Sequence, residues 1–316
     1  MRSDARMQID IVPNNSADIY QERVKKLDSW LREKFRNKWD KLLVDNSLNC
    51  FHDLSNSELS KFHLLANYLI RISTTYGHDE AENLIGLIQP LGYYGIAEIP
   101  GIIGLFNNEV IENDLLKIQH PSLPPGSVMT SKHDQNTIYR EDLSAAGKIL
   151  KLVPGLKEES LKYFGAICFV ESPNLKQAGE CISTSSKYVP GLIYSSEVPP
   201  ILLAECIIHE SAHLQLFYLE AANNLYNDYE CSIQTPLRPD LRPPAGLLHQ
   251  IFVLIRLREF YKTLSISKSS LVVKSMRQIH KRCGDIELEL VSGLSAIRDN
   301  RSRYTRCGNE IIDTMI

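Results

Sequence analysis

Residues 202–217 read Leu-Leu-Ala-Glu-Cys-Ile-Ile-His-Glu-Ser-Ala-His-Leu-Gln-Leu-Phe, and they contain the pattern His209-Glu210-x-x-His213. Two histidines four residues apart lie one turn apart on the same face of a helix, so both imidazoles can bind one metal ion. Residues 201–222 contain no proline or glycine and are mostly apolar, which predicts one long buried helix. The pattern therefore indicates a divalent-metal site on that helix. The alternative is a pair of partly buried histidines that are hydrogen-bonded to their neighbours.

The composition is that of an ordinary globular protein. The chain has 316 residues, of which 43% are hydrophobic and 23% charged, and its length suggests two structural units or one large one. Its net charge of −3 gives no reason to expect nucleic acid or an anionic membrane surface as a partner. No apolar run is long enough to span a bilayer, and no signal peptide is evident at the start. The seven cysteines form no Cys-x-x-Cys pair, so we expect reduced thiols and a cytoplasmic protein.

Helical periodicity dominates the first part of the chain. Apolar residues recur every three or four positions in several segments before residue 140. We expect residues 1–140 to form an N-terminal helical region that supports the fold or recruits a peptide. A stretch rich in glycine and proline interrupts this region and predicts a loop packed around other elements. The helices are expected at 17–44, 57–73, 79–90 and 109–118, and the loop at 92–104.

Residues 141–316 are expected to form the catalytic region. Three short runs directly before the metal helix predict a small sheet, and further helices follow that helix. The expected fold class is therefore mainly α, with a small β element adjacent to the His-Glu-x-x-His helix, and not a cupin or jelly roll. The strands are expected at 166–170, 181–185 and 192–194, and the later helices at 247–255, 271–297 with a break at Gly284-Asp285, and 310–315.

Two histidines do not make a stable metal site, so a third ligand decides the chemistry. A metzincin has glycine three residues and histidine six residues after its second histidine, where this chain has Leu216 and Leu219, which excludes that class. A gluzincin takes a glutamate from a later helix, for which Glu259 is the candidate. His249 is the preferred ligand because it begins an apolar helix directly after a rigid proline-rich segment. The alternative for His249 is a hydrogen-bonded core histidine.

Two further segments accompany the motif: Gly191-Leu192-Ile193-Tyr194-Ser195 before it, and Arg238-Pro239-Asp240-Leu241-Arg242-Pro243-Pro244-Ala245-Gly246-Leu247-Leu248-His249 after it. With His209–His213, they resemble the HExxH-motif family of peptide-modifying proteins. That family is found with biosynthetic clusters for ribosomally synthesised, post-translationally modified peptides (RiPPs). The resemblance covers residues 160–265 well and the C-terminal helices loosely. Leu237 replaces the aromatic residue that usually precedes the first arginine.

The resemblance implies an activity, because the family is regarded as iron(II)- and 2-oxoglutarate-dependent peptide β-hydroxylases. It implies a dioxygenase that uses Fe(II), 2-oxoglutarate and O2, with a ribosomal precursor peptide (leader and core) as its partner. Three protein ligands, His209, His213 and His249, would leave coordination positions open for 2-oxoglutarate and O2. The distal carboxylate of 2-oxoglutarate needs a bidentate cation, for which Arg242 and Arg238 are the candidates. Imidazole ligands suit zinc equally, so the metal is not fixed by the sequence.

Glu210 is the candidate catalytic residue, and its role separates the hypotheses. In a zinc metallopeptidase, the first alternative function, it would be the general base that activates metal-bound water. In the oxygenase it has no obligatory acid–base step and would orient a metal ligand. A second alternative is a non-catalytic partner that recruits the precursor peptide. Whether the chain forms a homodimer is also left open.

Overall fold

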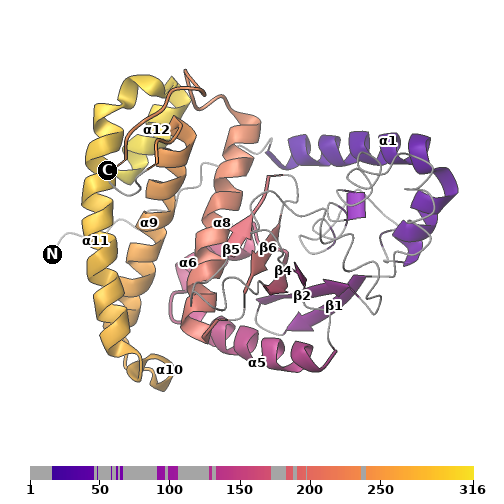
Figure 1. Cartoon of the computed structure of the whole chain (residues 1–316), viewed down its shortest axis with the longest axis horizontal. Coiled ribbons are helices and arrows are strands. Elements are labelled where there is room, and N and C mark those ends of the chain that lie inside the picture. Colours follow the sequence, from indigo (N-terminus) through magenta and orange to yellow (C-terminus); the bar gives the residue numbers. More distant parts are fainter. Residues whose placement is uncertain are drawn as a thin grey trace. The chain divides into compact units, whose positions relative to one another are not determined.

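The computed structural model describes residues 16–45, 48, 58, 62, 65–66, 91–96, 99–105, 128–129, 133–171, 183–187, 191–196, 198–235 and 240–316. These residues are mostly helical, which confirms the predicted mainly α class (Figure 1). The chain divides into two compact units, one of residues 21–214 and one of residues 215–316 with 1–20. No helix in the described part of the chain is long and apolar enough to cross a membrane.

The first helix, α1 (Ser16–Asp45), confirms the helix predicted at 17–44. Its apolar residues are buried at helical spacing. Among them Trp39 is fully buried and packs edge-to-face on Phe62, with ring centroids 5.6 Å apart. The Trp39 indole N–H donates to Asp28 Oδ1 at 2.8 Å, so the buried ring has its polar partner. The helices predicted at 79–90 and 109–118 lie outside the described residues, as does most of the one predicted at 57–73.

A sheet of six described strands lies in the unit of residues 21–214. The path through it runs β1-β2-β4-β6-β5, and β3 pairs with β4. β2, β4 and β6 are parallel to one another, whereas β1 is antiparallel to β2 and β5 is antiparallel to β6. The strands are β1 (Leu91–Ile96), β2 (Ile99–Leu105), β3 (Val128–Met129), β4 (Ala166–Glu171), β5 (Ser183–Ser185) and β6 (Leu192–Ser195).

The loop predicted at 92–104 is wrong, because β1 and β2 form an antiparallel pair there. Gly92 faces Gly104 across the two strands, and Tyr93 faces Ile103. Glycine weakens a strand but leaves its backbone donors and acceptors intact, and aromatic and β-branched neighbours favour the pleated conformation. Pairing along the strand therefore outweighs the local glycine signal.

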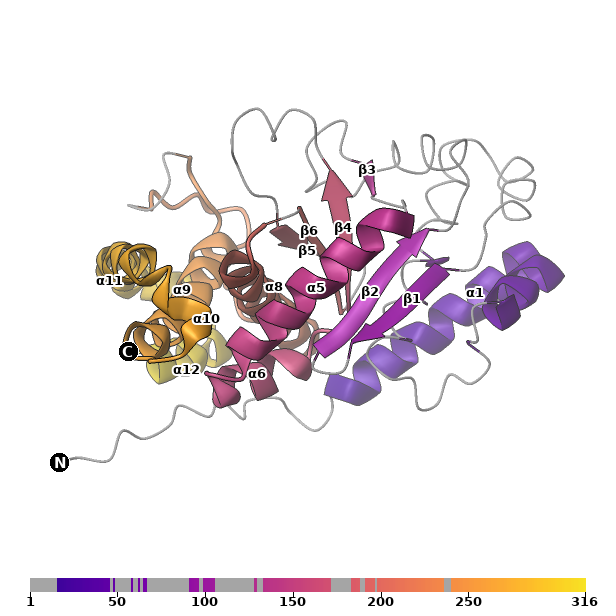
Figure 2. The same cartoon turned by 90° about the horizontal axis from the view of Figure 1, so that it is seen from below.

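The sheet contains strands from both regions that we expected to meet near residue 140. Ile102 of β2 pairs in parallel with Ile167 of β4, so strands from both sides of that boundary belong to one sheet. α5 (His133–Leu150) lies between these strands in the chain and packs along the sheet (Figures 1 and 2). α6 (Pro154–Leu161) then leads to β4, in which residues 166–170 are all buried. A continuous buried run is typical of a strand covered on both faces.

The helix predicted at 201–222 is confirmed as α8 (Pro200–Ala222), which follows β6 almost directly. Pro200 occupies its first position, where a missing N–H group costs little because no intrahelical acceptor exists there. Short connections of this kind hold a helix close to the sheet from which it emerges. The His-Glu-x-x-His segment therefore begins about two and a half turns into a helix that follows a fully buried strand.

The C-terminal unit is helical. The helices predicted at 247–255 and 310–315 are present and extend further than expected, and the break predicted at Gly284-Asp285 is wrong, because one helix continues through it. Buried Ile279, Ile286 and Leu290 hold that helix against its neighbour on both sides of the glycine, so packing outweighs the propensity penalty. The helices are α9 (Pro244–Ser265), α10 (Ser270–Val273), α11 (Met276–Asp299) and α12 (Arg306–Met315).

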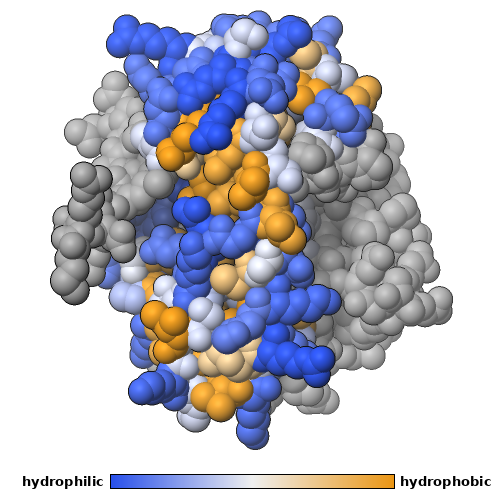
Figure 3. Space-filling model, turned by 90° about the vertical axis from the view of Figure 1, so that its left-hand side faces the viewer, coloured by the Kyte–Doolittle hydropathy of each residue, from blue (hydrophilic) through white to orange (hydrophobic). Residues whose placement is uncertain are grey.

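One surface of α11 carries exposed apolar side chains among charged ones (Figure 3). Leu288 is 73% exposed and Val291 is 67% exposed, one helical turn apart. Isolated apolar residues of this kind are ordinary at protein surfaces and do not by themselves indicate a partner. The homodimer accordingly stays a hypothesis.

Two glycines of the C-terminal unit should respond in opposite ways to substitution by alanine. A Cβ at Gly308 of α12 would lie 2.3 Å from the backbone oxygen of Leu225, so Gly308→Ala should lower the free energy of unfolding by about 2 kcal/mol or more. A Cβ at Gly284 would meet nothing within 4 Å, and alanine is the better helix former, so Gly284→Ala should raise it by about 0.5–1 kcal/mol. Urea unfolding of the two variants checks both signs, and equal effects would contradict the packing of α12 on Leu225.

Candidate metal site

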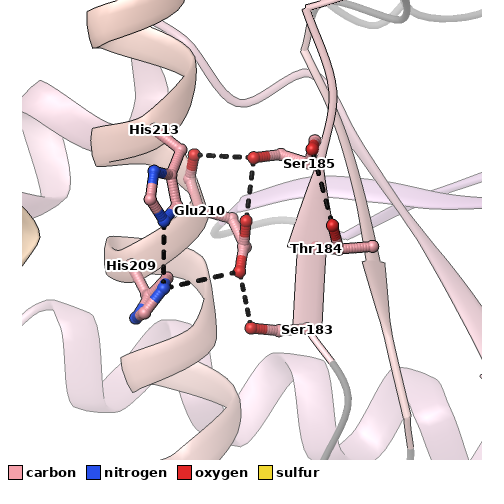
Figure 4. Close-up of polar contacts among 6 residues, drawn as sticks. All are labelled: Ser183, Thr184, Ser185, His209, Glu210 and His213. Carbon is pink, nitrogen blue, oxygen red and sulfur yellow. Dashed lines mark hydrogen bonds and ion pairs between the residues drawn. The ribbon is translucent and has the colours of Figure 1, made fainter. Parts of the chain in front are cut away.

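His209 and His213 project from one face of α8, one turn apart (Figure 4). Their Nε2 atoms are 3.2 Å apart, and their ring centroids are 4.9 Å apart. The two rings therefore converge on one point through the same nitrogen. A single N–H···N hydrogen bond could also join two neutral rings at this distance, so the geometry suits both a hydrogen-bonded pair and a pair of metal ligands.

The separation of the two nitrogens fits a shared metal ion. Metal–imidazole bonds are about 2.1 Å long, and two such bonds that meet at about 100° place their nitrogens about 3.2 Å apart. The observed 3.2 Å is this value. The side chain of His209 is 38% exposed, so an ion can reach the pair from solvent. The two histidines thus fit the predicted metal without rearrangement of α8.

Glu210 extends towards β5, and its carboxylate lies between the histidine pair and the serines of β5 (Figure 4). It is 2% exposed, and each of its carboxylate oxygens accepts a hydrogen bond from a serine hydroxyl. Ser183 Oγ donates to Oε1 at 2.6 Å, and Ser185 Oγ donates to Oε2 at 2.8 Å. The His209 Nε2 atom is 3.8 Å from Oε1, which is beyond hydrogen-bonding distance. The carboxylate therefore joins β5 to the metal-binding segment of α8.

Ser183 and Ser185 were not among the predicted site residues, although their strand was predicted. Residues two apart on a strand point to the same face, and these two hydroxyls face α8 while Thr184 lies between them. The available signal was a Ser-Thr-Ser alternation in a strand that is followed, after one further strand, by a helix with a buried glutamate. Nothing in the spacing alone indicates that one carboxylate receives both hydroxyls.

His249 lies in the unit of residues 215–316, near the start of α9. It is 9% exposed, its ring packs on Phe217 with centroids 5.0 Å apart, and its Nε2 atom is 2.9 Å from Glu220 Oε1. The same carboxylate oxygen accepts a hydrogen bond of 2.5 Å from the Tyr226 hydroxyl. Glu220 therefore serves two buried groups from the last turn of α8, which sequence analysis did not foresee.

Of the two predicted cofactor-binding arginines, the structure describes Arg242. Arg242 Nε forms an ion pair of 2.6 Å with Asp240 Oδ2, and the Arg242 side chain is 33% exposed. Its backbone pairs with Ile233 through two hydrogen bonds, which fixes its place ahead of α9. Arg238 lies outside the described residues. Glu259, the glutamate of the gluzincin alternative, is exposed on α9.

One arginine of α9 is buried. Arg256 is 5% exposed, donates from Nη1 to the Phe252 carbonyl at 3.0 Å, and donates from Nη2 to the Gln215 side-chain oxygen at 2.8 Å. Its guanidinium also stacks over the Phe252 ring at 3.5 Å. The hydrogen bond to Gln215 joins α9 to α8, to which Gln215 belongs. Arg256 thus has structural contacts of its own in the C-terminal unit.

Within the residues that the structure describes, no three histidine, cysteine, aspartate or glutamate side chains form a group arranged to hold a metal ion. His209 and His213 are brought together, and His249 is placed on Glu220 instead. The sequence matches no protein-family model and no curated protein. The third ligand therefore stays a prediction from the sequence.

The buried Tyr226 should make stability fall at alkaline pH. Burial raises the pKa of its hydroxyl far above the usual value, and the charge of Glu220 and the hydrogen bond to it act in the same direction. Above about pH 10, a tyrosine of the unfolded chain loses its proton while folded Tyr226 keeps it. The folded state then binds more protons, so this residue should lower the free energy of unfolding by about 1.4 kcal/mol per pH unit.

Urea unfolding between about pH 9 and pH 11 measures this slope. Tyr226→Phe should flatten it, although the variant also loses a hydrogen bond at every pH. Tyr229→Phe is the matched control, because Tyr229 is exposed and stacks on Tyr226 without contacting Glu220 through a described bond. An unchanged slope in Tyr226→Phe would contradict the protonated, buried hydroxyl.

Proposed function

We propose that this chain is an iron(II)- and 2-oxoglutarate-dependent oxygenase that β-hydroxylates a residue of a ribosomally synthesised precursor peptide in the cytoplasm. The observation that carries the metal site is the convergence of His209 and His213 Nε2 atoms at 3.2 Å. The choice of oxygenase rests on the sequence resemblance, which joins this motif to the arginine-containing segment that ends at His249. We propose His249 as the third ligand.

The iron would supply the O2 chemistry that amino-acid side chains cannot perform. The protein's own contribution is to hold two imidazoles on one helix, so that both nitrogens are in place before the ion arrives. α8 is held to the sheet by the contacts of Glu210 with β5. Such positioning by neighbouring groups keeps ligands in their binding geometry.

The contacts of Glu210 give it a structural role that an oxygenase can use. A general base needs a lone pair directed at the reacting water, within about 3.2 Å of it. Both oxygens of Glu210 accept hydrogen bonds from serines of β5, and the carboxylate is almost fully buried. The motif's glutamate therefore positions α8, although the second lone pair of each oxygen is compatible with a general base as well. Zinc-dependent peptide hydrolysis is the competing function, because a metallopeptidase and the proposed oxygenase would both use the His-Glu-x-x-His motif and its two metal-binding histidines.

Arg242 is the proposed partner of the distal carboxylate of 2-oxoglutarate. Asp240 pairs with its Nε atom, which is one of the five N–H donors of a guanidinium. A cation that is one-third exposed can also receive a second anion. Arg238 is proposed for the same role from its place in the sequence. A bidentate arginine pair discriminates the planar carboxylate better than lysine would.

The test is turnover of 2-oxoglutarate. Full-length protein is loaded with Fe(II) without oxygen, mixed with 2-oxoglutarate, and exposed to O2, and succinate is quantified with and without candidate precursor peptide. The proposal expects succinate from the wild type and none from His249→Ala. Peptide cleavage that depends on Zn(II) and disappears in Glu210→Gln, without any succinate, would replace the oxygenase by a metallopeptidase.

A further inference from the structure

We infer that Glu220 is the positioning residue of His249: its carboxylate holds Nε2 of the ring as the N–H donor and so assigns Nδ1 as the metal-binding nitrogen. This inference rests on the proposed function, in which His249 is a metal ligand. It adds a residue that the motif does not contain, and it chooses between the two nitrogens of the ring. Glu220 is seven residues beyond His213 on α8.

The geometry around the ring carries the first step. His249 Nε2 is 2.9 Å from Glu220 Oε1, and the Phe217 ring packs on the imidazole at 5.0 Å. A carboxylate can only accept, so the ring nitrogen that faces it carries the proton. A neutral imidazole that donates from Nε2 has its lone pair on Nδ1, and a metal binds through the lone pair. The contact with Glu220 therefore decides which nitrogen can be a ligand.

The second step concerns what fixes Glu220. Its Oε1 atom also accepts from the Tyr226 hydroxyl at 2.5 Å. Tyr226 is 2% exposed and lies against the ring of Tyr304, whose own hydroxyl donates to the Pro244 carbonyl at 3.0 Å. Pro244 is the first residue of α9, five residues before His249. Buried tyrosines thus hold both the carboxylate and the start of the helix that carries the histidine.

The third step is the chemistry of such an arrangement. A histidine ligand that gives its second N–H to a carboxylate has a fixed tautomer and a more basic ligand nitrogen, and losing that carboxylate typically lowers metal affinity about 10–100-fold. Glu220 is part-buried, with 22% of its side chain exposed, so its charge acts on the ring with little screening. Tyr226, as a donor, keeps the carboxylate oriented towards the ring. A positioning role for Glu220 follows without direct contact with the ion.

The experiment has two readouts that do not depend on turnover. Full-length protein with 15N-labelled histidine is examined by NMR without metal and with Zn(II), and Zn(II) affinity is measured against a competing chelator. His249 should show one tautomer, with the proton on Nε2, and Zn(II) should perturb Nδ1. Glu220→Ala should lose the single tautomer and lower the Zn(II) affinity about 10–100-fold. Glu220→Gln keeps an acceptor oxygen for the Tyr226 hydroxyl, so it replaces Glu220→Ala in both measurements if the alanine variant folds poorly.

A double-mutant cycle separates positioning from direct ligation. In a His249→Ala background, Glu220→Ala should cause no further loss of Zn(II) affinity. A full further loss would overturn the inference, because Glu220 would then bind the ion itself. Glu310→Ala is the matched control, since that glutamate pairs with Arg306 on the surface of α12 and should change neither readout.

The failures of the inference and of the proposed function are distinct. If His213→Ala abolishes Zn(II) binding and His249→Ala leaves it unchanged, the inference fails while the histidine pair survives. If His213→Ala also leaves Zn(II) binding unchanged, the metal site of the proposed function fails as well. A His249 ring with its proton on Nδ1 in the wild type would overturn the inference directly.

Discussion

His213→Ala is expected to lower the affinity of the protein for Fe(II) or Zn(II) by about 100-fold or more. A three-ligand site with a binding free energy of about 10 kcal/mol owes roughly 3 kcal/mol to each ligand, which corresponds to that factor. His213 Nε2 is one of two nitrogens that converge at 3.2 Å, so no other described ring replaces it at that point. Equilibrium competition with a chromogenic chelator measures the change.

The same variant should fold normally without metal. The pair occupies the accessible side of α8, where His213 is part-exposed and alanine is the better helix former. We therefore expect the thermal midpoint of the metal-free variant to stay within about 2 °C of the wild type. His280→Ala, an exposed histidine of α11, is the control for loss of an imidazole as such. Equal metal affinity in His213→Ala and the wild type would show that His209 and His213 do not bind the ion together.

Glu210→Ala is expected to destabilise the fold by about 2–4 kcal/mol. The substitution removes the acceptor of two hydroxyls at once, and an unpaired buried donor costs about 1–3 kcal/mol. Ser185 is 8% exposed, and Ser183 is partly buried, so water replaces the carboxylate poorly at both positions. Glu210→Gln keeps one acceptor oxygen and should lose about half as much. Urea unfolding at neutral pH measures both effects.

The serines provide the reciprocal test. Ser183→Ala with Ser185→Ala leaves the buried carboxylate without its two donors and should be destabilising by a similar amount. Adding Glu210→Ala to the serine variants should then cost much less than it does in the wild type, because the interacting groups are already gone. Glu205→Gln, one turn earlier on α8, controls for loss of a charge on that helix. Additive losses would mean that the strand and the helix are not coupled through Glu210.

Glu210→Gln also separates the two functions. In the oxygenase, a folded Glu210→Gln should still form succinate, with a loss of about 10–100-fold, since the residue only positions α8. In a metallopeptidase, the loss of a general base removes about 10²–10⁴ of the rate. Stability and turnover of one variant, measured together, therefore distinguish a positioning glutamate from a catalytic one.

The sequence predicted the elements whose local pattern and tertiary packing agree. α8 combines helical spacing, an uninterrupted apolar run and a proline at its start, and it was predicted to within one residue of each end. The β1–β2 pair was missed because glycines 92 and 104 lower the local strand propensity. Hydrogen bonding between the two strands stabilises the pair, and the local sequence does not show this pairing. The break at Gly284 was predicted from propensity alone, and packing of α11 on α9 outweighs it. Long-range pairing is the information that a single sequence does not display.

In the candidate site, too, the sequence predicted local relations between residues but not the long-range contacts. The spacing of His209 and His213 is sufficient to place them together, because four residues on a helix fix their relation. The contacts of Glu210 with Ser183 and Ser185 join residues more than 24 positions apart, and those of Glu220 with His249 join residues 29 apart. No periodic pattern connects such pairs. They depend on how β5 and α9 pack, which the structure supplies.

The most direct measurement of the central claim is the visible absorption of the Fe(II)-loaded protein on anaerobic addition of 2-oxoglutarate, which needs neither peptide nor turnover. A keto acid that chelates protein-bound Fe(II) gives a charge-transfer band in the visible range. We expect this band in the wild type and in Glu210→Gln, and its absence in His213→Ala. Iron-loaded wild-type protein that shows no band at saturating 2-oxoglutarate would contradict an oxygenase built on His209 and His213.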